Sequence, residues 1–117
     1  MDELSLASYA EAFALTQIVE APVYATVLVV AFGARLSRAL GASILANLVS
    51  HPLFTFALAP AAVALMPPIP GVVVCETLVW LLEAGLLYAW LRRDLPLLLA
   101  VSLLANCCSF VVGLLVL

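Results

Sequence analysis

The sequence predicts an all-α integral membrane protein with four transmembrane helices. Apolar residues make up 68% of its 117 residues and charged residues only 9%, whereas a soluble domain is about 45–50% apolar and about 25% charged. A chain this short has too little interior to bury so many apolar side chains in water. Mean hydropathy is +1.31. Lipid is therefore the expected solvent, which excludes a soluble enzyme, a nucleic-acid binder and a disordered linker.

Each helix is predicted from an apolar segment near the length of about 20 residues that a bilayer requires. The breaks contain Pro, Gly or Arg, which stop helices or favour water. The second segment is longer than needed, so we expect it to tilt, to kink at Pro52 or to end near Pro60. A proline-rich loop is expected at 66–71. The four spans are expected at about residues 9–32, 38–66, 72–91 and 95–117, all in one domain, 1–117.

Arginine positions predict the orientation. The chain has no lysine, and its four arginines fall in pairs on the loops after the first and third spans: Arg35, Arg38, Arg92 and Arg93. Cationic loops stay in the cytoplasm. Both arginine loops are then inside, and both termini and the proline-rich loop are outside. We expect a multi-pass protein of the plasma or inner membrane, N-out and C-out.

The chain contains an apparent internal repeat. Residues 40–50 and 99–109 match at six of eleven positions, and Glu20-Ala21 in the first span has a counterpart in Glu83-Ala84 in the third. Two tandem hairpins, at about 9–66 and 72–117, would enter the membrane the same way and be related by a pseudo-two-fold axis along its normal. Chance similarity remains an alternative, because apolar helices use few residue types.

Polar side chains recur at mid-depth in the spans. Glu20, Asn47, Glu83 and Asn106 fall near the bilayer midplane, where a charged side chain costs about 2.5–3.5 kcal/mol on insertion scales. Helical spacing adds polar neighbours on the same faces, giving a predicted polar core. Its other members are Gln17, Tyr24, Ser43, Ser50, His51, Ser102 and Ser109. Within each hairpin, Glu20 is expected to reach Asn47, and Glu83 to reach Asn106.

Two interpretations of these acids stay open. Ionisable groups at mid-membrane mark ion paths and proton relays, which gives a functional interpretation. Hydrogen bonds that tie helices together give a structural one, worth about 0.6 kcal/mol each on average. The structural interpretation is slightly favoured, although hydrogen bonding between helices rarely requires an acid.

The remaining candidates favour structural roles. For His51, a satisfied interior residue is preferred to a ligand or relay, and Glu76 is expected at the headgroup level rather than in an acidic vestibule. The cysteines are interpreted as small buried hydrophobes rather than as ligands of a soft metal. They are Cys75, Cys107 and Cys108. No metal and no cofactor are expected.

No catalytic motif stands out, so we expect the protein not to be an enzyme. The sequence has no Gly-rich phosphate loop and no nucleophile with a base nearby. The favoured hypothesis is an accessory or scaffolding subunit that holds another membrane protein or a second copy of itself in the lipid bilayer, without nucleic acid. The alternative is a small oligomeric transporter or channel, coupled to protons or cations through the paired Glu and Asn residues.

Overall fold

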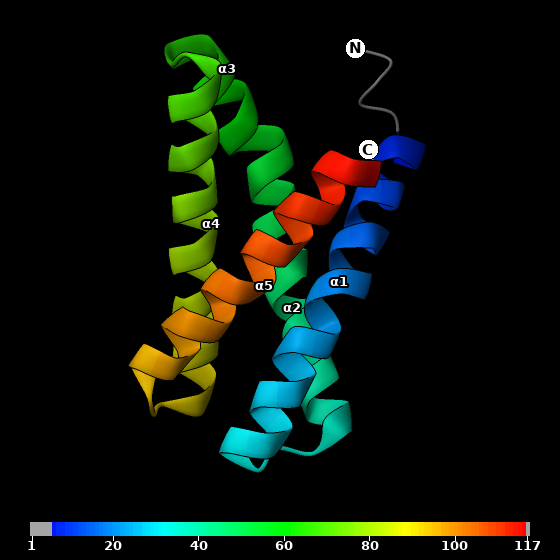
Figure 1. Ribbon diagram of the computed structural model, residues 1–117, viewed down its shortest axis with the longest axis vertical. Helices are drawn as coiled ribbons and strands as arrows, with labels where there is room; N and C mark the ends of the chain where they lie inside the picture. The colour runs from blue at the N-terminus through cyan, green and yellow to red at the C-terminus, as the bar shows by residue number, and fades with distance from the viewer. Residues whose placement is uncertain (1–5, 117) are drawn as a thin grey trace.

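The computed structural model describes residues 6–116 and is all-helical (Figure 1). Its elements are α1 (Leu6–Phe32), α2 (Leu36–Leu53), the π-helical segment η2 (Phe54–Leu58), α3 (Ala59–Leu65), α4 (Pro68–Leu91) and α5 (Leu95–Val116). Four stretches are long and apolar enough to cross a membrane: Tyr9–Phe32, Leu36–Leu65, Pro68–Leu91 and Leu95–Val116. Residues 1–5 and Leu117, which the predicted domain includes, lie outside the described residues.

The ends of the helices follow the expected breaks, with one correction. Gly33 ends α1 with a φ of +70°, a left-handed conformation that glycine adopts without steric cost. The third span begins at Pro68 rather than at 72, so the predicted loop at 66–71 shortens to Met66 and Pro67. A proline in the first turn of a helix loses no intrahelical hydrogen bond and has a suitable φ. The prolines of this stretch therefore start the helix.

The second span bends through a π-helical turn between two prolines. Pro52 lies in the last turn of α2, and Pro60 in the first turn of α3. Between them, the Ala59 N–H donates to the Phe54 carbonyl, five residues back instead of four. Because Pro60 has no N–H, regular α-helical bonding cannot be complete here. The span continues to Leu65 as a bent helix, one of the outcomes expected from the sequence.

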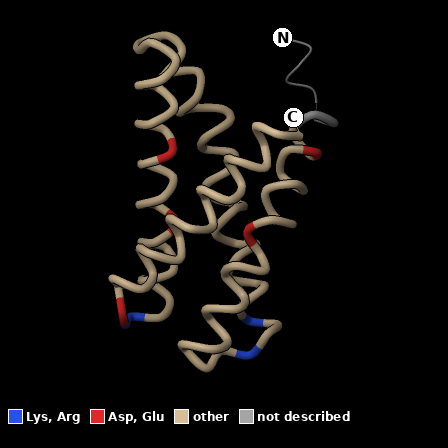
Figure 2. Tube along the Cα trace, viewed as in Figure 1, with Lys and Arg blue, Asp and Glu red and all other residues tan. Residues whose placement is uncertain are grey.

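The helices form a bundle of four spans. Helix α1 packs against α2 and α5, and α4 packs against α5, α2 and α3, so α1 and α4 lie on a diagonal. The longest dimension is 43 Å, comparable with a bilayer including its headgroups, about 40–45 Å. The arginines gather at one end, opposite the termini and the α3–α4 turn (Figure 2).

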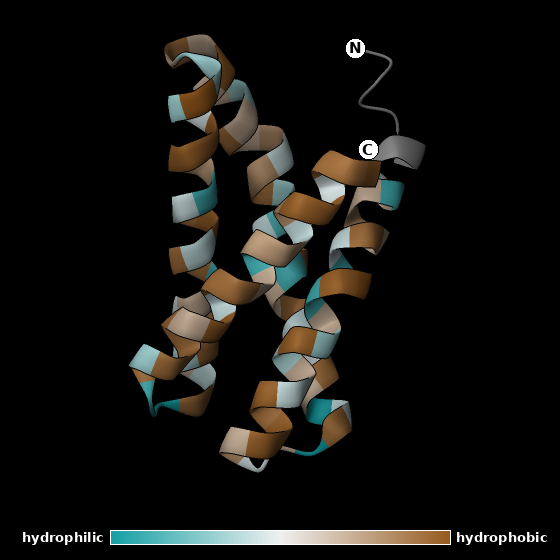
Figure 3. Cartoon of the chain, in the orientation of Figure 1, coloured by the Kyte–Doolittle hydropathy of each residue, from teal (hydrophilic) through white to brown (hydrophobic). Residues whose placement is uncertain are grey.

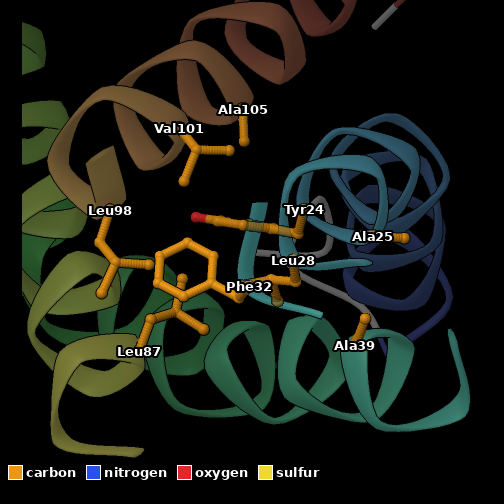
Figure 4. Packing of buried hydrophobic residues seen from close by; sticks show 9 residues of the cluster. All are labelled: Tyr24, Ala25, Leu28, Phe32, Ala39, Leu87, Leu98, Val101 and Ala105. Atoms are coloured by element: carbon orange, nitrogen blue, oxygen red, sulfur yellow. The ribbon is translucent and has the colours of Figure 1, made fainter. Parts of the chain in front are cut away.

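Apolar packing fills the half of the bundle near the arginines. Figure 4 shows this core, in which Leu87, Leu98 and Val101 lie near the rings of Tyr24 and Phe32, while Ala25 and Ala39 lie farther from these rings. Its members are Tyr24, Ala25, Leu28, Phe32, Ala39, Leu87, Leu98, Val101 and Ala105. Hydrophobic residues also dominate the outer faces (Figure 3); Val30, for example, is 80% exposed. Such a surface is suited to lipid and not to water.

Candidate functional site

The polar residues singled out in the sequence lie together in the bundle interior. Eight of them are buried, each exposing 5% of its surface or less: Glu20, Tyr24, Ser43, Asn47, Ser50, Glu83, Ser102 and Asn106. Gln17, His51 and Ser109 are half-buried. Because hydrocarbon offers no hydrogen bonds, these side chains have to find partners in one another.

Glu83 accepts hydrogen bonds from the other three spans. The Tyr24 hydroxyl donates to its Oε1 at 2.6 Å, and Asn106 Nδ2 to the same atom at 3.1 Å. Ser50 Oγ donates to Oε2 at 2.5 Å. An ionised carboxyl is an acceptor only, and O–H donors to a carboxylate make short hydrogen bonds of about 2.5–2.7 Å. Glu83 therefore joins α1, α2 and α5 to α4.

Glu20 is equally buried but has fewer partners. Ser109 Oγ donates to its Oε2 at 2.6 Å. Its Oε1 is buried with no hydrogen-bond partner among the residues that the structure describes. A buried polar atom left unpaired costs about 1–3 kcal/mol. The two acids thus have unlike environments, one with three donors and the other with one.

Asn47 lies beside Glu20, as expected, but its amide group donates to other partners. Its Nδ2 donates to Gln17 Oε1 at 3.0 Å, and Gln17 Nε2 donates to Ser43 Oγ at 3.1 Å. Gln17 lies one turn before Glu20 on the same helix face. The amide pair joins α1 to α2, and it leaves the Glu20 Oε1 atom without a donor.

A cavity of about 540 Å³ lies above the polar core, between the carboxyl groups and the end of the bundle that carries the α3–α4 turn. Glu20, Glu83, Asn47 and Asn106 line its deep part. Its walls are mainly apolar and come from all the helices. Its volume falls in the range of small-molecule sites, about 300–1,000 Å³.

Glu76 and His51 also line this cavity. Glu76, expected at the headgroup level, is half-buried in its wall; its spacing of seven residues from Glu83 is the sequence signal that could have placed it there. His51 also lines the cavity, and its Nε2 is buried without a partner among the described residues. Its ring packs against Tyr9 and Phe13, with centroid distances of 5.0 and 5.5 Å.

The opposite end of the bundle is closed. Beyond the apolar core, the Arg93 guanidinium donates to the Phe32 carbonyl and lies over the Phe32 ring, 5.0 Å from its centroid. Arg38 lies 5.7 Å from the centroid of the Trp90 ring. These contacts join α1 to the α4–α5 loop and α2 to α4. The cavity therefore does not continue through to the arginine loops.

The described part of the chain contains no cluster of side chains suited to bind a metal ion. No group of three or more His, Cys, Asp or Glu residues between residues 6 and 116 could hold a metal ion. Cys75 is buried in the cavity wall, Cys108 is half-buried and Cys107 is exposed.

Comparison with known protein families, with curated proteins and with solved structures finds no match for this chain. The class of this protein is therefore described from its fold and its cavity alone. It is an all-helical protein whose four long apolar helices are consistent with a multi-pass membrane protein, with two buried carboxyl groups beside a cavity.

The Tyr24 hydrogen bond to Glu83 gives a direct test of this polar core. We expect Tyr24→Phe to lower the free energy of unfolding by about 0.6–1.7 kcal/mol, the average and upper values for hydrogen bonds between membrane helices. Tyr88→Phe is the matched control, because Tyr88 is 39% exposed. Unfolding in mixed micelles with increasing dodecyl sulfate measures both. Equal effects of the two substitutions would contradict the assignment.

Proposed function

We propose that the protein is a small membrane transporter that holds its cargo in the cavity and exchanges it for a proton at Glu20. The observation that carries this proposal is the Glu20 Oε1 atom, which is buried without a partner in a residue that lines the cavity. A buried carboxyl group that served only to join helices would accept hydrogen bonds on both of its oxygens. An open acceptor on a carboxyl can take a proton or hold a cation.

The contrast with Glu83 supports this assignment. Glu83 has its acceptors occupied by three helices, so it fits the structural interpretation of the buried acids. Glu20 has one donor and a free oxygen, so it fits the functional one. The titratable groups that share the cavity with it are Glu76 and Glu83 on α4, His51 on α2 and Cys75 on α4.

Movement of the cargo is coupled to movement of a proton because the two compete for one carboxyl oxygen atom. A carboxylate that holds a cation cannot hold a proton on the same oxygen, so each leaves as the other arrives. The second requirement of a transporter is access from one side at a time. The cavity lies toward the end of the bundle with the α3–α4 turn, while the apolar core and Arg93 close the arginine end. Transport requires this core to open.

We propose further that the arginine loops are cytoplasmic and both termini are outside, in the plasma or inner membrane. The gathering of all four arginines at one end of the bundle supports this, since cytoplasmic loops carry the excess of cations. In this orientation, the cavity of the described structure lies toward the outside.

We also propose that the two hairpins arose by duplication of one two-helix unit. The two hairpins, at about 9–66 and 72–117, would be related by a two-fold axis along the bundle. Crossed hydrogen bonds support it: Ser50 of the first hairpin donates to Glu83, and Ser109 of the second donates to Glu20. The matching helices α1 and α4 also lie on a diagonal, as a two-fold axis between them requires.

A second candidate function is an accessory subunit that holds a second copy or another membrane protein. A groove of about 370 Å³ between α2 and α4 favours it. Small residues of α2, including Gly41, Ala42 and Ala46, line this groove. Small residues let the backbone of a neighbouring helix approach closely.

The exchange at Glu20 is testable in proteoliposomes loaded with sodium, potassium or an organic ammonium salt and diluted into buffer without it. As the cation leaves, protons should enter and acidify the lumen, which a trapped pH-sensitive dye reports. We expect Glu20→Gln to lower this rate by about tenfold or more, because an amide cannot bind the exchanged proton. Glu11→Gln is the control, since Glu11 is exposed. Full activity of Glu20→Gln, or no proton movement with any salt, would contradict the proposal.

The orientation is testable with single cysteines in a chain whose three native cysteines are replaced by serine. Ile69→Cys in the first turn of α4 should react in intact cells with a maleimide that cannot cross the membrane. Ser37→Cys beside the arginines should react only after the cells are opened. Both positions are exposed, so accessibility within the protein does not separate them. The reverse pattern would overturn the orientation.

The groove is testable by filling it. Gly41→Leu should lower the fraction of protein that copurifies with a second copy or partner in mild detergent by about tenfold. A Cβ at Gly41 meets no atom within 4 Å, so the isolated fold should tolerate the change. Gly85→Leu is the control, because its Cβ is equally free and lies outside the groove. Native mass spectrometry gives the stoichiometry. Unchanged association of Gly41→Leu would exclude this groove as the interface.

A further inference from the structure

The cavity has properties that select a class of cargo, and this inference rests on the proposed transport function. We propose that the cargo is a monovalent organic cation with an apolar body. Its charged group would lie at the Glu20 carboxyl, and its body against the apolar walls.

The first of these properties is the volume of the cavity. A water molecule takes about 30 Å³ of liquid, and the cavity holds about 540 Å³. A bare metal ion would leave most of this space to water between apolar walls. A molecule of many carbon atoms fills it and gains the transfer free energy of its apolar surface, about 25 cal/mol per Å².

The second property is the chemistry of the cavity walls. Phe54, Val63, Met66 and Phe110 are among the lining residues, and none offers a side-chain oxygen. A small inorganic cation in a protein takes several oxygen ligands. The carboxyl oxygens of Glu83 are already accepting hydrogen bonds, whereas Glu20 Oε1 is buried without a partner among the described residues. The mainly apolar wall around this oxygen suits an ammonium-type or fully substituted cation better than a stripped metal ion.

The third property is the charge of the residues that line the cavity. Three carboxyl groups line the cavity, those of Glu20, Glu76 and Glu83. All four arginines lie at the opposite end of the bundle (Figure 2), and the chain has no lysine. The cavity therefore attracts a cation and disfavours an anion. One positive charge on the cargo matches Glu20, the buried carboxyl group whose Oε1 has no hydrogen-bond partner among the described residues.

The exchange balances for such a cargo. When the organic cation leaves the Glu20 carboxylate, one proton binds to the same group, and the reverse step releases that proton as the next cation binds. One positive charge replaces another, and no bond to carbon forms or breaks. Glu83 keeps its donors throughout and holds the four spans together.

Tetraphenylphosphonium is a suitable probe, because it has one permanent charge and an apolar body. We expect the full chain in lipid nanodiscs to bind it above the level of empty nanodiscs, measured by equilibrium dialysis. Tetraphenylborate has nearly the same shape and the opposite charge, so it should show no such excess. Glu20→Gln should weaken phosphonium binding by about tenfold or more, and Glu11→Gln should leave it unchanged.

A second variant reduces the free volume of the cavity without altering Glu20. Gly113 lines the cavity, and a Cβ there meets no atom within 4 Å. Gly113→Leu should therefore fold, occupy part of the space and lower phosphonium binding by about tenfold. Gly85→Leu lies outside the cavity and should bind like the unsubstituted chain. Circular dichroism and thermal melting in the same nanodiscs confirm that each variant is folded.

The outcomes separate this inference from the transport proposal. Phosphonium binding that depends on both Glu20 and Gly113 supports the cargo class. Binding that is absent, or unchanged in both variants, overturns it. If sodium or potassium gradients then still drive proton entry through Glu20, the transport proposal stands with an inorganic cargo. If they do not, both proposals fail together.

Discussion

A carboxyl group in the middle of a membrane must be given hydrogen-bond donors by the protein, and Glu83 shows what this demand does to a fold. Tyr24, Ser50 and Asn106 donate to it from three different spans. Each donor fixes the rotation and depth of its helix relative to α4. Apolar contacts cannot do this so specifically, because lipid tails are as apolar as the side chains they replace. The crossing points of the bundle, and the cavity above them, follow from this one buried acid.

The two buried acids, Glu20 and Glu83, have unlike surroundings. Tyr24 lies buried beside Glu83, while Tyr88, five residues after Glu83, lies 39% exposed near the arginine end. Asn106 serves Glu83, whereas Asn47 pairs with Gln17. An acid that loses its donors becomes costly to keep in lipid. Such a residue is most readily retained where it has a functional role in addition to packing.

Much of the architecture was predictable from the sequence, because apolar length and helical spacing reflect local physics. The spans were placed within a few residues, and the interior faces of α1, α2, α4 and α5 carry the residues expected there. Hydrogen-bond partners were less predictable. Asn47 lies beside Glu20 as expected, but it donates to Gln17 and Ser43, because helix tilt decides which side chains hydrogen-bond across an interface. Pro68 opened a helix where a loop was expected, since proline stops a helix from within but is tolerated at its start.

The π-helical turn at Phe54–Leu58 changes which residues of the second span can reach the cavity. Each residue of an α-helix advances the side-chain direction by about 100°, and a π turn holds one residue more than an α turn. Continuing the inner face of α2 at regular α spacing would bring Ala61 and Leu65 inward. Instead Ala62 and Met66 line the cavity, one position later, and Ala61 and Leu65 are exposed. The extra residue therefore shifts the inward-facing positions beyond residue 58 by one residue along the sequence.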